Sequence, residues 1–162
     1  MRGLVGSLLG FVLCVHAAGC YSVVDAVVDD VTDPGGMMTV AIDSGTPGTL
    51  PGLASGDPLA ITAQSNSLVI ALTCKADASG NSAAKILGTA GGRMVLDILA
   101  GNGNQLQVHS AGKSFIADAG TISLATNADG TISGSYATTG SVMGDGTAVT
   151  LTGTLTSIPR QK

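Results

Sequence analysis

A strict alternation of aliphatic and hydroxyl side chains near the C-terminal end is the feature that most constrains this chain. Successive side chains of a β-strand point to opposite faces of the sheet. The alternation over residues 149–156 therefore predicts a strand with one buried face and one solvated face. The two faces are Val149, Leu151, Gly153 and Leu155, and Thr150, Thr152, Thr154 and Thr156.

Similar segments occupy most of the chain from Leu59 onward. They are short runs rich in Ile, Val, Leu and Thr, bounded by Gly, Asn, Asp and Ser. Such runs are typical of antiparallel β structure. The run at residues 67–75 has no strongly polar face, which predicts a central strand covered on both sides.

Three turn signals predict how the last strands pair. We expect three-residue loops at 101–103 and 128–130 and a two-residue turn at 145–146. These loops keep the aliphatic side chains on one face, and exposing one of them costs about 1.5–3 kcal/mol. The expected opposite pairs are Leu96–Val108, Ile98–Leu106, Ile122–Tyr136, Leu124–Gly134, Tyr136–Leu155 and Val142–Val149. The predicted fold is all-β, with an antiparallel meander over residues 93–158 that forms a small barrel or a two-layer sandwich.

The first residues have the pattern of a signal peptide. Arg2 is the only charged residue before Asp25, and an apolar stretch runs from Gly3 to Ala18. A charged start followed by a short apolar segment is typical of an export signal. The stretch is shorter than the roughly 20 residues that cross hydrocarbon. We therefore expect cleavage rather than a permanent membrane span.

The signal segment ends in Ala17-Ala18-Gly19-Cys20, which resembles the lipobox of bacterial lipoproteins. Leucine usually stands three places before the cysteine, so Ala17 departs from the pattern and leaves ordinary signal-peptidase cleavage open. The resemblance implies cleavage before Cys20, diacylation of Cys20 and membrane anchoring through the acyl chains. It also implies transfer to the outer membrane, because the position after Cys20 is not aspartate.

We expect three segments along the chain. They are a signal peptide over residues 1–19, a lipidated, acidic and Pro/Gly-rich tether over 20–58, and an antiparallel β domain over 59–162. Within the tether, residues 37–43 are compatible with a first strand. Residues 120–159 resemble the C-terminal strands of small uncharacterised bacterial lipoprotein β domains, a resemblance that implies no particular activity.

Charge and cysteine content narrow the classes of partner. Cleavage before Cys20 removes Arg2 and no acidic residue, so the net charge falls from −4 to −5. An acidic protein lacks the counterion release that drives nucleic-acid binding, so we expect no nucleic-acid partner. Once Cys14 is removed and Cys20 acylated, Cys74 has no partner for an intramolecular disulfide. We interpret Cys74 as a small core residue.

The sequence offers no constellation that predicts catalysis or cofactor binding. His109 is the only histidine after the signal segment, and we expect it on the outer face of a strand. There is no G-x-S-x-G motif for a nucleophile, no zinc ligand set and no calcium-loop motif. We assign Asp129 and Asp145 to turns and predict no catalytic residue, metal or cofactor.

We therefore expect a non-catalytic binding or structural module of the bacterial envelope, held to the membrane by Cys20 and contacting another envelope component. The alternative is a barrel that carries an apolar ligand or a lipid. An enzyme is the least expected class. In the carrier hypothesis the ligand would contact the inward-facing residues Leu106, Val108, Phe115, Tyr136 and Leu151.

Overall fold

The computed structural model describes residues 35–75, 82–99 and 103–161. The signal segment, Cys20 and the acidic residues that follow it lie outside the described residues. The chain divides into two units between Thr32 and Asp33. All described residues belong to the second unit.

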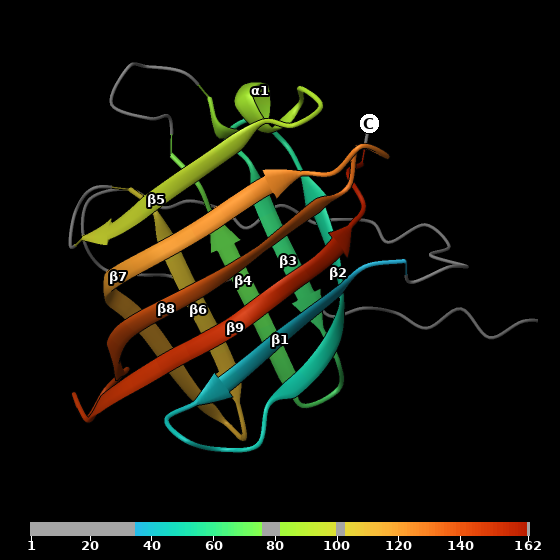
Figure 1. The fold of residues 1–162 in the computed structure, drawn as a ribbon. Coiled ribbons are helices and arrows are strands. Elements are labelled where there is room, and N and C mark those ends of the chain that lie inside the picture. Colours follow the sequence, from blue (N-terminus) through green and yellow to red (C-terminus); the bar gives the residue numbers. More distant parts are fainter. Residues whose placement is uncertain (1–34, 76–81, 100–102, 162) are drawn as a thin grey trace, which may run out of the picture. The chain divides into compact units, whose positions relative to one another are not determined.

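Eight antiparallel strands of the described residues form a closed barrel (Figure 1). Around the ring the order is β1-β2-β3-β4-β6-β7-β8-β9, and β9 pairs again with β1. The ring strands are β1 (Met37–Ile42), β2 (Gly48–Ser55), β3 (Ala60–Gln64), β4 (Leu68–Thr73), β6 (Gln105–Ser110), β7 (Lys113–Thr126), β8 (Ile132–Val142) and β9 (Ala148–Ile158). The all-β prediction is confirmed. Of the two predicted architectures, the structure has the barrel.

The alternation in β9 sets its two faces as predicted. Val149, Leu151 and Leu155 are buried, whereas the four threonines between and beside them are exposed. Burying such aliphatic side chains on one face is what holds a sheet of this kind in register. The prediction that the strand at residues 67–75 is covered on both sides is wrong, because Val69 and Thr73 on the outer face of β4 are exposed.

The predicted hairpin between residues 93–99 and 105–110 is not formed. Strand β5 (Arg93–Leu99) pairs with β7, so that Leu96 lies opposite Ile122, and it makes no ladder with β6. Strand β6 has β4 on one edge and the first part of β7 on the other. Both edges of β6 are therefore occupied, and β5 takes the remaining part of the same β7 edge.

Strand β7 pairs with two strands along one edge because it bends in the middle. Its register with β8 shifts between Ala117 and Ala119. Gly120 follows with φ 129°, a backbone conformation that favours glycine. A Cβ at Gly120 would lie 2.4 Å from the Ala137 carbonyl oxygen. The close approach of β7 and β8 at this bend therefore requires glycine.

The two last hairpins differ in how well the turn signals predicted them. Ile122 lies opposite Tyr136 and Leu124 opposite Gly134, as the loop at 128–130 predicts. The predicted register of the final hairpin is wrong by two residues, because Tyr136 lies opposite Gly153 and not opposite Leu155. The Val142 N–H donates to the Thr147 carbonyl, so a longer loop containing left-handed Gly144 and Gly146 replaces the two-residue turn. A slip of two residues leaves both faces unchanged.

The predicted boundary between tether and β domain at residue 59 lies too late in the chain. Strands β1 and β2 precede it and complete the barrel. Pro51 lies inside β2, and its missing N–H costs no bond because pairing with β3 begins only at Gly52. Part of the expected tether is thus strand β2.

One short helix, α1 (Ala83–Leu87), lies at the end of the barrel where β1 begins and β9 ends (Figure 1). The Ser82 side chain caps its first turn, and Ala83 and Leu87 are buried against the core. The Thr126 hydroxyl donates to the Leu87 carbonyl, and the Arg160 guanidinium donates to the Ala84 carbonyl at 3.1 Å. No helix within residues 35–75, 82–99 or 103–161 is long and apolar enough to span a membrane.

Candidate functional site

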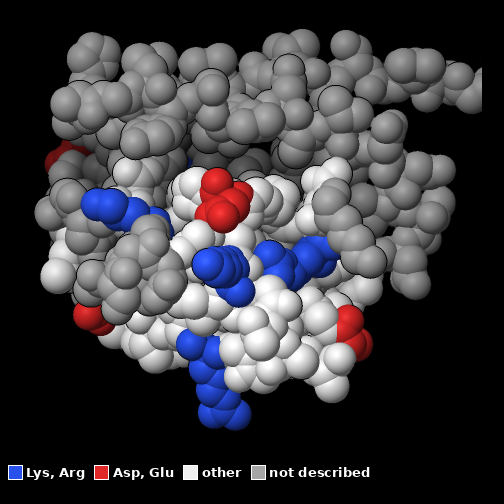
Figure 2. Space-filling view, turned by 90° about the horizontal axis from the view of Figure 1, so that it is seen from above, with Lys and Arg blue, Asp and Glu red and all other residues white. Residues whose placement is uncertain are grey.

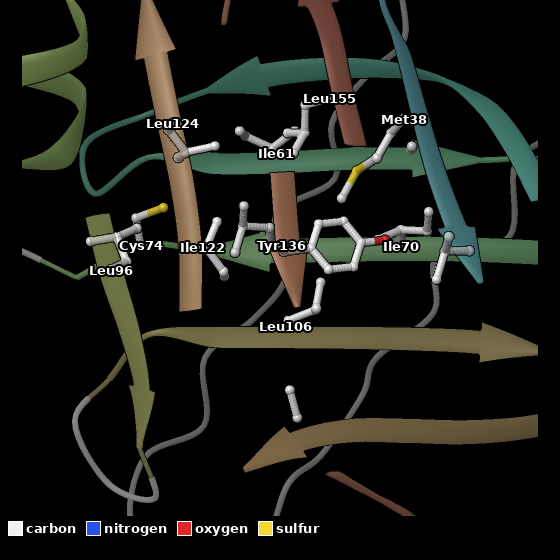
Figure 3. Packing of buried hydrophobic residues seen from close by; sticks show 14 of the residues in the cluster. Met38, Ile61, Ile70, Cys74, Leu96, Leu106, Ile122, Leu124, Tyr136 and Leu155 are labelled. Carbon is white, nitrogen blue, oxygen red and sulfur yellow. The ribbon is translucent and has the colours of Figure 1, made fainter. Parts of the chain in front are cut away.

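The barrel interior brings together all five residues that the sequence analysis assigned to it. Leu106 and Val108 lie on β6, Phe115 on β7, Tyr136 on β8 and Leu151 on β9. Each is buried. They belong to one hydrophobic cluster to which all the remaining strands also contribute side chains. Figure 3 shows Tyr136 among aliphatic side chains from the facing wall, including Ile61 and Ile70.

Among the residues that the structure describes, Tyr136 is the one buried aromatic side chain with a polar group. Its hydroxyl donates to the Thr39 backbone carbonyl of β1 at 2.7 Å, although β9 lies between β8 and β1. Gly153 of β9 makes this reach possible, since a Cβ there would lie 2.4 Å from the Tyr136 hydroxyl oxygen. Burial raises the pKa of Tyr136 above its ordinary value, so the phenol stays a neutral donor.

The Tyr136 contact coincides with an interruption of the β1–β9 ladder. Met38 pairs with Leu155 and Ala41 with Thr152, but no pair forms between these two positions. The Thr154 N–H donates instead to the Thr39 hydroxyl oxygen at 2.9 Å. The Thr39 carbonyl thereby becomes available to Tyr136. Nothing in the sequence indicated the Thr39 carbonyl as the partner of Tyr136.

Cys74 is a core residue, as the sequence analysis expected. Its side chain is buried beyond the end of β4, and burial raises the pKa of its thiol to about 12. The nucleophile in thiol chemistry is the thiolate. At neutral pH Cys74 is therefore an unreactive thiol in the folded barrel.

The raised pKa of Cys74 predicts a loss of stability in alkaline solution. The pKa of the folded thiol is about 12, whereas the ordinary thiol pKa is 9.0, so the stabilisation is present below pH 9 and is lost as the pH rises toward 12. Relative to a Cys74→Ala variant, the free energy of unfolding should fall by about 1.4 kcal/mol per pH unit above pH 9. Urea unfolding of both proteins at pH 8, 10 and 11 measures this difference, and a constant difference would contradict it.

The other candidate polar residues serve the turns and strands that hold them. The Asp129 carboxylate accepts from the Thr131 hydroxyl at 2.7 Å and from the Thr131 N–H at 3.0 Å, which lowers the pKa of Asp129. The Asp145 carboxylate accepts from the Thr147 N–H at 2.8 Å, which lowers the pKa of Asp145. These bonds confirm the assignment of both aspartates to turns.

His109 contacts a serine on the neighbouring strand. Its Nδ1 lies 3.0 Å from the Ser114 hydroxyl oxygen on the neighbouring strand, and the residue is half-buried. Across residues 35–75, 82–99 and 103–161 no three His, Cys, Asp or Glu side chains form a group that could hold a metal ion.

Lysine and arginine side chains gather at the end of the barrel that carries α1 (Figure 2). Lys85 lies in α1, Arg93 begins β5 and Arg160 contacts α1. Lys75 follows β4, and its N–H donates to the Asn104 side chain at 2.8 Å. Acidic side chains stand between them in the same view. This end of the barrel therefore has a mixed charge in which cations are prominent.

The outer wall carries a groove across three strands. It has a volume of about 270 Å³ and is lined by residues 93–95 of β5, 123–125 of β7 and 133–135 of β8. The lining residues on β7 and β8 are mostly serine, alanine and glycine, which are smaller than the lining residues of β5. The depression lies over these small residues. No local signal in the sequence marks this groove, because its residues come together only after β5 pairs with β7.

The comparisons with known proteins found no match to a family model, a curated protein or a solved structure at the thresholds applied.

Proposed function

We propose that this chain is an exported bacterial lipoprotein, anchored in the outer membrane through acylated Cys20, whose barrel serves as a non-catalytic binding or spacer module of the envelope. The observation that carries the proposal is the export signal ending in Ala17-Ala18-Gly19-Cys20, followed after a short acidic segment by a closed barrel. An anchor of this kind places a folded domain at a membrane without a transmembrane helix.

The position of Gly36, where the chain enters the barrel, is consistent with an anchor on the N-terminal side. The Gly36 carbonyl accepts from the Gly52 N–H at 3.0 Å. Gly36 passes so close to the end of β9 that a Cβ on it would lie 2.5 Å from the Ile158 Cα. Residues 21–34 would extend at most about 50 Å from this point. In the proposed arrangement the α1 end, with its lysines and arginines, faces the headgroups.

Packing of the interior supports a module that acts through its outer surface. The inward residues are buried against one another, and the Tyr136 hydroxyl already has a partner in the Thr39 carbonyl. A carrier needs room for its ligand inside the barrel. We therefore favour recognition of another envelope component by the outer wall over transport of an apolar molecule.

The anchor is tested by metabolic labelling with palmitate in a bacterial host. The full chain should incorporate label and appear in the outer-membrane fraction, whereas a Cys20→Ala variant should lose essentially all label, because no thiol remains at the acylation site. A Cys74→Ala variant is the matched control and should label like the parent. Equal label in the parent and in Cys20→Ala would end the lipoprotein proposal.

The same Cys20→Ala protein, purified from the host, separates the two binding hypotheses. Native mass spectrometry should give the mass of the chain with no additional small molecule across several preparations. A lipid that repeatedly co-purifies, and that is lost when Leu106 is replaced by a bulkier residue, would overturn the non-carrier part of the proposal.

A further inference from the structure

The outer face of β5 carries the most exposed large hydrophobic side chains of the described residues. Val95 is 68% exposed and Leu99 is 58% exposed, and both point outward from the same strand. Met94, Leu96 and Ile98 alternate with them and are buried. Single exposed aliphatic residues are common on protein surfaces. Here two of them lie on one short strand, and one of the two, Val95, also lines the groove.

The charges on this face are arranged symmetrically about Val95. Arg93 precedes it by two residues and Asp97 follows it by two, so all three side chains lie on the outer face. If two copies of β5 cross antiparallel at Val95, Arg93 of each copy lies against Asp97 of the other. A two-fold interface requires this kind of self-complementary surface.

We propose that the outer face of β5 is the interface of a homodimer with its two-fold axis at Val95. The two Val95 side chains contact each other, and two Arg93–Asp97 pairs flank them. The same axis places Leu99 of one copy opposite position 91 of the other, next to Arg93, which lines the groove of about 270 Å³.

The second copy packs on the face of β5 and does not extend the sheet at its edge. The Asp97 backbone carbonyl points to that edge and accepts from the Asn104 side chain at 3.0 Å, and Asn104 in turn accepts from the Lys75 N–H at 2.8 Å. This bridge occupies the edge at Asp97. The Asp97 carboxylate has several acceptor positions, so it can receive Arg93 of the second copy in addition to its contacts within its own chain.

Cysteine crosslinking of the full chain tests the interface directly. A Val95→Cys variant should form a disulfide-linked dimer on mild oxidation, because the two positions meet at the axis. Val69→Cys is the matched control, since Val69 is an exposed valine on the outer face of β4. The parent chain gives the background from its own cysteines. Equal dimer yields for the two variants would overturn the proposal.

Charge reversal then tests the register. In the Val95→Cys protein, Arg93→Asp or Asp97→Arg alone should lower the dimer yield about tenfold or more, because like charges would face each other across the axis. The double variant restores opposite charges and should recover the yield of Val95→Cys. Single reversals without effect, or a double variant as weak as the singles, would refute this interface. Neither result depends on acylation of Cys20.

Discussion

Replacing Gly153 by alanine is expected to destabilise the barrel by about 3 kcal/mol or more. The added Cβ would lie 2.0 Å from the Thr39 carbonyl oxygen and 2.4 Å from the Tyr136 hydroxyl oxygen. The first neighbour is backbone, so it cannot rotate away, and the β1–β9 wall would have to separate. Urea unfolding followed by circular dichroism gives the difference in free energy of unfolding.

Gly35→Ala is the matched control for this substitution. No atom lies within 4 Å of a Cβ built at Gly35, so the same chemical change there should leave the unfolding midpoint nearly unchanged. Equal stability of Gly153→Ala and the parent would mean that the Tyr136–Thr39 contact is not formed as described.

Truncation of Tyr136 is expected to have an effect of similar size. Tyr136→Ala removes a buried ring at the centre of the core and should cost about 3–5 kcal/mol through the cavity left behind. Tyr136→Phe keeps the ring and removes only the donor to the Thr39 carbonyl, at a cost of about 1–3 kcal/mol for the unsatisfied acceptor. Both values come from denaturant titrations of the same kind.

The pair of variants separates packing from hydrogen bonding at Tyr136. If Tyr136→Phe matches the parent, the hydroxyl contributes nothing and the ladder interruption at Thr39 has another cause. If Tyr136→Ala is no worse than Tyr136→Phe, the ring does not fill the interior.

The local parts of this fold could be predicted because each depended on neighbouring residues. The alternation in 149–156 fixed which side chains of β9 are buried, and the loop at 128–130 fixed the register of Ile122 with Tyr136. The final turn failed because a shift of two residues preserves both faces, so the hydrophobic pattern could not reject it. There the left-handed glycines of the longer loop decided the register.

The long-range parts could not be predicted from such patterns. Strand β5 follows β4 in the chain but pairs with the far half of β7, because β4 and the near half of β7 occupy both edges of β6. Strand β2 was hidden by Pro51 and its surrounding glycines. In each case the deciding contact joins residues that are distant in sequence.

The candidate sites also divide into a part that local sequence patterns predict and a part that depends on long-range pairing. The inward residues Leu106, Val108, Phe115, Tyr136 and Leu151 could be listed from strand faces, and the structure buries each of them. The groove beside Arg93 depended on which strand lies next to β5, so no local signal marked it. The Tyr136–Thr39 bond spans 97 positions in the chain.

The placement of β5 outside the ring also sets where the barrel is weakest. Every ring strand has a ladder on both edges, whereas among the described residues β5 has a ladder only with β7. Elements held on one side detach at lower free energy than the body of a protein. Detachment of β5 would expose the core residues that Leu96 and Ile98 cover, while the ladders of the eight ring strands would stay intact.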